Sequence, residues 1–220
     1  MILVPVKNLS AAKQRLAAVL DQPSRTELAQ TMLHDVVATL AAWPRRTDCA
    51  LVTSDPFALE LAQEYDFEII PDPANPGETG AIEMATSLCV ARGIDSTLVL
   101  PADIPLIQAS ELDEILAQAP DEGTVLAPAA DRRGTNAAFR RPANLFPLRF
   151  GNDSFKPHLA AAQATGKPCI VLQLPGIALD VDNPEDLQRL LAHPGETRTQ
   201  SLLRRWTLAG CFPATGTEGS

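Results

Sequence analysis

The sequence predicts an α/β protein in which helices cover both faces of a mostly parallel, mixed sheet. Short apolar runs typical of buried strands alternate along the chain with longer segments of helical period, and this alternation is typical of parallel sheets. The chain has 220 residues, of which 45% are hydrophobic and 20% are charged, as in ordinary soluble globular domains. No linker divides the chain, so we expect one domain over residues 1–195 and a tail over residues 196–220.

Apolar patterning and capping residues define the elements expected in the first part of the chain. The run Ile2–Val6 predicts the first buried strand. A helical pattern over 10–20 follows, and Asp21 opens a longer helix to about residue 42 whose apolar residues share one face. The run 49–53 predicts the second strand. Ser54-Asp55-Pro56 is typical of a helix start, and that helix extends to about residue 65.

The same alternation continues in the rest of the chain, with proline, glycine and small polar residues between the elements. Three prolines between 71 and 76 predict a loop. Ser110, Ser154 and Asn183 stand at positions typical of helix N-caps. The remaining expected strands are 67–70, 97–100, 124–127, 137–140, 170–174 and 177–181; the remaining helices are 80–92, 111–118, 155–165 and 183–191, with 198–212 as a last helix and 213–220 disordered.

Charge and composition exclude several classes of partner. The net charge of −9 makes nucleic acids and anionic membranes poor partners, because both bind surfaces rich in lysine and arginine. No apolar run approaches the roughly 20 residues that a membrane-spanning helix needs, and the first strand lacks a signal-peptide flank. None of the four cysteines stands at Cys-x-x-Cys spacing, so we expect reduced thiols in a cytoplasmic protein.

The first candidate site residues are basic. Lys7 ends the first strand, and Lys13 and Arg15 follow after a turn. Open parallel sheets bind ligands at the carboxyl ends of their strands, where Lys7 is expected. A triphosphate would neutralise three such neighbouring cations, and arginine could bind two of its oxygens at once. The alternative is a solvated basic helix start. The chain has neither a P-loop nor a Gly-x-Gly-x-x-Gly turn here.

The second candidate group is acidic. Asp103 follows an apolar strand and has prolines on both sides, which restrict the backbone around it. Asp180 and Asp182 alternate across Val181 near an expected strand end, so they would project to the same side. Carboxylates grouped in this way are typical magnesium ligands. The alternatives are an ordinary turn at Asp103 and a helix cap at Asp182.

Two polar loops form a third candidate group. Asp131-Arg-Arg-Gly-Thr-Asn136 follows the expected strand at 124–127, and Phe150-Gly-Asn-Asp-Ser154 leads into a helix. Amides at a helix start bind phosphate or carboxylate well. The alternative for Ser154 is a simple cap. His158 is the one histidine of the sequence near these loops.

Taken together and in this order, the motifs resemble those of the 2-phospho-L-lactate guanylyltransferase family, whose members make a guanylated precursor of coenzyme F420. The resemblance covers about residues 1–192. It implies a nucleotidyltransferase domain with a GT-A-type, Rossmann-like sheet, GTP as co-substrate and Mg²⁺ as cofactor. The implied acceptor is a small phosphorylated three-carbon acid: phosphoenolpyruvate, 3-phospho-D-glycerate or 2-phospho-L-lactate. The matching stretches are Pro5–Lys7 with Ala12–Leu16, Leu100–Leu106, Asp131–Asn136, Phe150–Phe155 and Asp180–Leu187.

The resemblance also implies roles for individual residues. The implied metal ligands are Asp103, Asp180 and Asp182; the implied acceptor-binding residues are Lys7, Thr135, Gly151 and Ser154; the implied nucleotide-binding residues are Lys13, Arg15 and Gly80; and the implied catalytic residues are Lys7, Lys13, Arg15 and Asp103. The chain departs from the family in one segment, because Gly77-Glu-Thr-Gly-Ala81 stands where many members have Gly-Leu-Asn-x-Ala. In the family, that segment resembles a guanine-recognition feature.

These roles predict an in-line attack by an acceptor phosphate oxygen on the α-phosphorus of GTP, with release of pyrophosphate. No general base is expected, because the phosphate oxygen is already ionised. One alternative is a nucleotidyltransferase for another acceptor, such as a molybdopterin or a sugar phosphate. A second is a nucleotide-binding module without catalysis. The sequence leaves the choice of acceptor open, and a homodimer is the assembly we consider.

Overall fold

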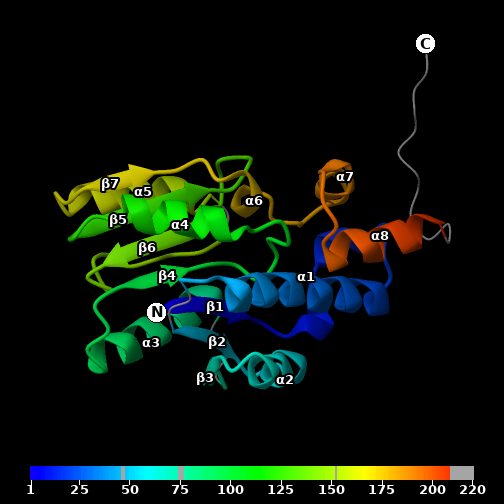
Figure 1. Cartoon of the computed structure of the whole chain (residues 1–220), viewed down its shortest axis with the longest axis horizontal. Helices are drawn as coiled ribbons and strands as arrows, with labels where there is room; N and C mark the ends of the chain where they lie inside the picture. Colours follow the sequence, from blue (N-terminus) through cyan, green and yellow to red (C-terminus); the bar gives the residue numbers. More distant parts are fainter. Residues whose placement is uncertain (46–47, 74–76, 152, 209–220) are drawn as a thin grey trace, which may run out of the picture.

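The sheet has seven strands in the order β3-β2-β1-β4-β6-β5-β7 (Figure 1). The computed structural model describes residues 1–45, 48–73, 77–151 and 153–208. All strands expected up to residue 174 are present, which confirms the α/β class. Their bounds are β1 Ile2–Val6, β2 Cys49–Thr53, β3 Glu68–Ile70, β4 Thr97–Val99, β5 Gly123–Pro128, β6 Thr135–Arg141 and β7 Cys169–Val171.

One strand makes the sheet mixed. β1 pairs in parallel with β2 and with β4, and β5 pairs in parallel with β7. β6 lies between β4 and β5 and runs antiparallel to both. Its first residue, Thr135, is therefore opposite Pro128, the last residue of β5. The start of β6 thus lies at the same edge of the sheet as the carboxyl ends of the parallel strands.

Helices pack on both faces of the sheet. The side chains of β1 alternate, so that Val4 packs with the apolar residues of α1, α2 and α4, and Leu3 packs with those of α3 and α5. This alternation gives a core on each face. The helices are α1 Gln22–Ala42, α2 Pro56–Glu64, α3 Glu78–Ala91, α4 Ala109–Gln118, α5 Phe155–Ala164, α6 Pro175–Ala178, α7 Pro184–Ala192 and α8 Arg198–Leu208, with 3₁₀ turns η1 Leu9–Ala11 and η2 Gln14–Leu16.

A third apolar cluster joins the last helices to α1, and Figure 1 shows α7 and α8 together at one end of the molecule. Leu28 of α1, Leu190 of α7 and Leu203 of α8 are all buried in it. Asp35 accepts hydrogen bonds from the backbone N–H groups of Arg198 and Thr199 at the start of α8. The expected helix from 198 is therefore present over 198–208. The rest of that helix, and the disorder expected at 213–220, lie outside the described residues.

The helix expected at 10–20 was a wrong prediction. The segment forms η1 and η2 instead, and Lys13 between them is in the left-handed conformation with φ 54°. Such a conformation costs a non-glycine residue about 1 kcal/mol or more and interrupts a helix. The cause lies in the tertiary structure, because the turn at Lys13 directs its side chain toward Asp103 and Asp182.

The strand expected at 177–181 was also wrong. Residues 175–178 form α6, where the N–H groups of Gly176 and Ile177 both donate to Glu111 of α4. Gly176 is required there, since a Cβ atom would lie 2.3 Å from the carbonyl oxygen of Leu106. Apolar periodicity cannot separate a five-residue strand from one helical turn. Asp180 and Asp182 therefore do not share a strand face, although both still reach the site.

One of the expected helix caps was wrong as well, and a second occupies the N-cap position without a capping hydrogen bond. α4 begins at Ala109, and Gln108 forms a capping box with Glu111, so Ser110 lies inside the helix. Ser154 precedes α5, but its side chain makes no capping hydrogen bond. Asp21, Asp55 and Asn183 do cap their helices as expected. Across the described residues, no helix has the length and apolar character needed to cross a bilayer.

Candidate active site

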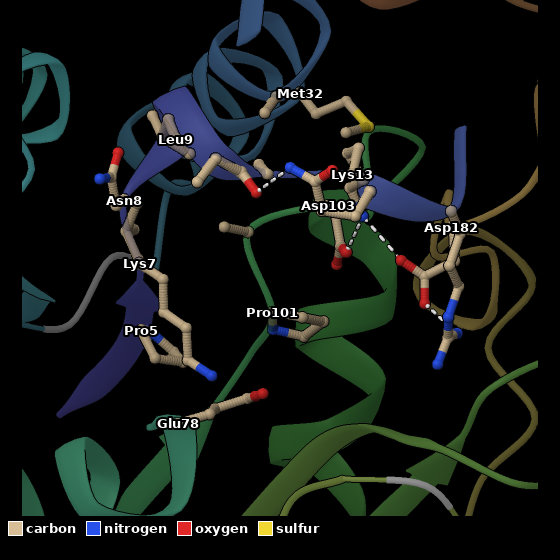
Figure 2. A pocket seen from close by; sticks show the side chains of 17 residues that line it. Pro5, Lys7, Asn8, Leu9, Lys13, Met32, Glu78, Pro101, Asp103 and Asp182 are labelled. Carbon is tan, nitrogen blue, oxygen red and sulfur yellow. Dashed lines mark hydrogen bonds and ion pairs between the residues drawn. The ribbon is translucent and has the colours of Figure 1, made fainter. Parts of the chain in front are cut away.

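Lys13 lies between two aspartates that come from distant parts of the chain (Figure 2). Its ammonium donates a hydrogen bond to Asp103, which follows β4, and a second of 2.9 Å to Asp182, which precedes α7. Arg15 approaches the other oxygen of Asp182 at 3.1 Å. The N–H of Val181 donates to the carbonyl oxygen of Asp103 at 3.1 Å, and this bond holds the two acidic segments together.

These contacts change the ionisation of the groups involved. Burial by itself would lower the pKa of Lys13, but the charges of Asp103 and Asp182 raise that pKa above its usual value. Burial by itself would raise the pKa of Asp182, but Lys13 and Arg15 hold it below its usual value. Lys13 is therefore a fixed positive charge and Asp182 a fixed negative one. Where the sequence suggested a triphosphate as the counter-anion of these cations, the protein's own carboxylates take that role in the structure.

Glu78 is a site residue that sequence reasoning missed. It is the first residue of α3, directly after Gly77, whose φ is +93°. Figure 2 shows the ammonium of Lys7 pointing toward its carboxylate. Burial and the negative charge of Asp103 raise the pKa of Glu78 to about 7, and Lys7 opposes that shift. The signal in the sequence was a charged residue directly after a glycine, at the point where a loop meets a helix.

Asp180 is a second carboxylate with a raised pKa. Burial and the charge of Asp103 raise that pKa to about 6. The side-chain amide of Asn136 donates to Asp180 at 2.9 Å and also to the carbonyl oxygens of Ile177 and Ala178. Asn136 therefore orients Asp180 and the segment before it. It stands in a motif that the sequence singled out, but its side chain was not among the predicted site residues.

Two adjoining cavities surround these residues. The first, which we call the Lys13 pocket, has a volume of about 540 Å³ and is lined by Lys7 and Lys13. The second, which we call the Thr135 pocket, has a volume of about 510 Å³ and is lined by Thr135 and Asp180. Five residues line both pockets: Arg15, Glu78, Pro101, Asp103 and Asp182. The two pockets therefore meet at a boundary rich in carboxylates and cations.

The wall of the Thr135 pocket is built by the loop after β5 and the loop before α5. Ser154 accepts a hydrogen bond of 3.1 Å from the N–H of Thr135. Arg133 binds Asp153 at 2.7 Å across the two loops. The N–H of Phe150 donates to the hydroxyl of Thr79 on α3, which connects this wall to the helix that carries Glu78. Gly151 lines the same pocket.

The structure brings together nearly all the predicted site residues. Lys7 lines the Lys13 pocket, Thr135, Gly151, Ser154 and Asp180 line the Thr135 pocket, and Arg15, Asp103 and Asp182 line both. Gly80 is the exception, because it lies inside α3 and lines neither of the two pockets. The residue of α3 that lines both is Glu78. In the described part of the chain, no three acidic, histidine or cysteine residues are already grouped as a metal site.

The fold is that of nucleotidyltransferases of known structure. A putative nucleotide-diphospho-sugar transferase from Desulfovibrio desulfuricans matches with a TM-score of 0.76 and 19% identity, over 94% of each chain. A 4-diphosphocytidyl-2C-methyl-D-erythritol synthase matches with a TM-score of 0.58 and 15% identity, over 87% of this chain and 97% of that one. These likenesses show the fold, which is the Rossmann-like sheet of nucleotidyltransferases of known structure.

The family follows from sequence relatives. The model of the family described as "Guanylyl transferase CofC like" matches residues 1–217, and the chain belongs to that family. A phosphoenolpyruvate guanylyltransferase of Rubrobacter xylanophilus is 40% identical over 87% of this chain and 93% of the relative. A 2-phospho-L-lactate guanylyltransferase of Methanothermobacter thermautotrophicus is 34% identical over 92% and 89%. The family expected from the five motifs is thus confirmed.

Proposed function

We propose that this protein transfers GMP from GTP to a small phosphorylated three-carbon acid and releases pyrophosphate, as a step of coenzyme F420 biosynthesis. The acceptor class is phosphoenolpyruvate, 3-phospho-D-glycerate or 2-phospho-L-lactate. One observation carries the proposal: Lys13, Asp103 and Asp182 meet where two cavities adjoin. Two pockets that share a charged boundary suit two anionic substrates whose phosphates must approach each other. The names of the relatives support guanylyl transfer and two of these acceptors, phosphoenolpyruvate and 2-phospho-L-lactate.

The proposed reaction forms one P–O bond and breaks another. An ionised oxygen of the acceptor phosphate attacks the α-phosphorus of GTP, and the bond from the α-phosphorus to the bridging oxygen of pyrophosphate breaks. The electron pair of that bond leaves with pyrophosphate, so no proton has to be removed from the nucleophile. This chemistry depends mainly on positioning and on charge neutralisation. The site contains cations at the pocket boundary, which is where such a reaction needs them.

Charge repulsion is the main obstacle that the side chains have to offset. Two unit charges at about 4 Å repel by about 4 kcal/mol at an effective dielectric constant near 20. Lys13 is already held at the boundary by Asp103 and Asp182, so little of its side-chain freedom is left to lose when phosphates bind. Arg15 lies beside it on Asp182. We assign the Lys13 pocket to the triphosphate of the donor and the Thr135 pocket to the acceptor. Lys7, which lines the Lys13 pocket and points toward Glu78, would contact phosphate from the side of the donor.

The donor set fits a magnesium ion shared between protein and substrate. Mg²⁺ usually keeps several waters and binds one or two carboxylates together with substrate phosphates. Asp103 and Asp180 line the Thr135 pocket together, and the raised pKa of Asp180 arises from burial and from Asp103. These two residues would hold the ion, with Asp182 nearby on Lys13. When bound, the ion would neutralise phosphate charge at the reacting centre.

The direct test is a survey of acceptors. The purified protein is incubated with GTP, Mg²⁺ and each of the three acids, and the product is identified by mass. The proposal expects pyrophosphate and a guanylated adduct with at least one acid. Parallel reactions with ATP and CTP measure the preference for guanine, in which Gly80 of α3 is the sequence-predicted contact. GTP binding without any adduct would support a nucleotide-binding module instead. If a parallel reaction with a sugar phosphate gave an adduct and none of the acids did, the acceptor would be a sugar phosphate and not a three-carbon acid.

A further inference from the structure

A buried histidine lies behind the wall of the Thr135 pocket. His158 is on the first turn of α5 and is 1% exposed. Its Nδ1 atom lies 2.9 Å from the hydroxyl oxygen of Thr135. Its Nε2 atom lies 2.7 Å from the backbone nitrogen of Arg149. Each ring nitrogen therefore has one polar partner, and His158 itself does not line the Thr135 pocket.

The partner of Nε2 determines the position of the ring proton. A backbone N–H can only donate, so Nε2 must accept the hydrogen bond from Arg149 and cannot carry a proton. A neutral ring then has its single proton on Nδ1, which donates to Thr135. Burial and the neighbouring positive charge of Arg140 lower the pKa of His158 to about 4. The ring is therefore neutral near pH 7, in agreement with the hydrogen bonds.

This tautomer restricts the hydroxyl group of Thr135. A hydroxyl has one hydrogen and two acceptor lone pairs, and the Nδ1–H group of His158 uses one of those lone pairs. The hydrogen of Thr135 must then point away from His158. The hydroxyl of Ser154 lies 3.4 Å away and is itself the donor toward Thr135, so it does not accept the hydrogen of Thr135. The remaining direction is into the pocket that Thr135 lines.

We infer that His158 is a positioning residue: by donating from Nδ1, it turns the hydroxyl hydrogen of Thr135 into the pocket, where it donates to an anionic oxygen of the acceptor. This inference rests on the proposed function, because that function places the acceptor in the Thr135 pocket. It adds a residue that lines neither pocket and belongs to none of the predicted sets. The neutral ring provides a donor to Thr135 without adding a charge to the pocket.

Two substitutions separate positioning from packing. An asparagine amide can replace the Nδ1–H donor of histidine, and a glutamine amide can replace the acceptor at Nε2. His158→Gln therefore keeps the contact with Arg149 and loses the donor to Thr135, whereas His158→Asn does the reverse. We expect His158→Gln to raise the KM for the acceptor at least about tenfold, with the KM for GTP unchanged, because the hydroxyl of Thr135 is then no longer oriented to donate to the charged acceptor. His158→Asn should keep the acceptor KM within about threefold of wild type.

Thr135→Val tests whether His158 acts through the hydroxyl of Thr135. In that background His158→Gln should cause no further change in acceptor KM, because the hydroxyl is gone. Equal increases of the acceptor KM in His158→Gln and His158→Asn would show a role in packing and overturn the inference. So would a full further increase when His158→Gln is combined with Thr135→Val. The acceptors used are phosphoenolpyruvate and 3-phospho-D-glycerate.

A spectroscopic measurement keeps the inference separate from the proposed function. Nitrogen-15 NMR of the histidine ring at pH 7 should show a protonated Nδ1 and an unprotonated Nε2. The opposite tautomer, or a charged ring, would overturn the inference even if the enzyme transfers GMP. If the wild-type protein makes no adduct with any acid, the proposed function fails. Binding of phosphoenolpyruvate by wild type and by His158→Gln, measured by calorimetry without GTP, then decides the positioning role: equal affinities would overturn it.

Discussion

The ammonium of Lys13 lies 2.9 Å from the carboxylate of Asp182, although 169 positions separate the two residues in the sequence. Lys13 adopts a left-handed backbone conformation, with φ 54°, on its way to this contact. Strained residues of this kind persist where the surrounding structure determines them fully, and they are often found at functional sites. The pair joins the loop after β1 to the segment before α7, and Asp103 completes it from the loop after β4.

Lys13→Met should remove most of the activity. The substitution keeps the apolar stem of the side chain and removes the charge between Asp103 and Asp182, which would then repel each other and the phosphates. We expect kcat to fall by about a hundredfold or more, as for the loss of one preorganised donor at a reacting phosphate or carbonyl group. Steady-state rates of pyrophosphate release measure this effect. Lys156→Met, on the exposed side of α5, is the matched control and should behave as wild type.

Asn136→Ala should weaken the response to Mg²⁺. Asn136 holds Asp180 at 2.9 Å, so without it the carboxylate loses its orientation. We expect the Mg²⁺ concentration for half-maximal rate to rise about tenfold or more, as for the loss of a residue that orients a metal ligand. Asn144→Ala removes an exposed asparagine and serves as the control. An unchanged Mg²⁺ response in Asn136→Ala would contradict the assignment of Asp180 as a ligand.

Glu78→Gln should stabilise the substrate-free protein above pH 7. The pKa of Glu78 is raised from 4.5 to about 7 in the folded state, so the folded protein binds more protons than the unfolded chain between these values. The free energy of unfolding therefore falls as the pH rises from about 4.5 to 7. Above pH 7 the protein bears the full cost of holding Glu78 ionised in a buried position. We expect Glu78→Gln to recover about 1–3 kcal/mol at pH 8 and little at pH 4. Urea unfolding of wild type and Glu78→Gln at the two pH values measures this difference. An equal change in the free energy of unfolding at pH 4 and pH 8 would contradict the prediction.

Lys7 and Asp103 could be placed at the site from the sequence because each follows a recognisable strand, whereas Asp180 and Asp182 were placed through an expected strand at 177–181 that the structure does not contain. Lys7 and Asp103 stand just after apolar runs, and parallel strands bring their carboxyl ends to one edge of the sheet. What the sequence could not supply was the contact partner. Nothing in the local pattern around Lys13 indicates that it binds Asp182, because tertiary structure decides that pairing.

The errors have the same origin. The segment 177–181 was expected as a strand because an apolar run this short has no identifiable period, but Ile177 and Ala178 belong to α6, whose N–H groups donate to Glu111 on α4. Ser154 was expected as a cap, since serine before a helix usually is one, but its hydroxyl accepts from Thr135 instead. Glu78, Asn136 and His158 escaped the predicted set because their roles arise from burial and from partners elsewhere in the chain.

His158 should make stability fall in mild acid. Its pKa is about 4 in the folded protein against 6.5 for the unperturbed side chain, so the unfolded chain binds the additional proton between these values. Stability is therefore complete above about pH 6.5 and is lost as the pH falls toward 4, by about 2–3 kcal/mol for this group. His158→Gln should remove this part of the pH dependence in urea titrations, whereas His193→Gln should retain it. Identical pH slopes in wild type and His158→Gln would show that folding does not lower the pKa of His158.

The most direct test of the whole account is Mg²⁺-dependent pyrophosphate release by Asp103→Asn, measured with GTP and whichever acid the wild type accepts. Asp103 binds Lys13, lines both pockets and is a proposed metal ligand. The account predicts that release falls to background while the circular dichroism spectrum and the melting temperature stay near those of wild type. Asp121→Asn, at an exposed position in the loop before β5, should remain fully active. Turnover by Asp103→Asn at the wild-type rate would contradict the account.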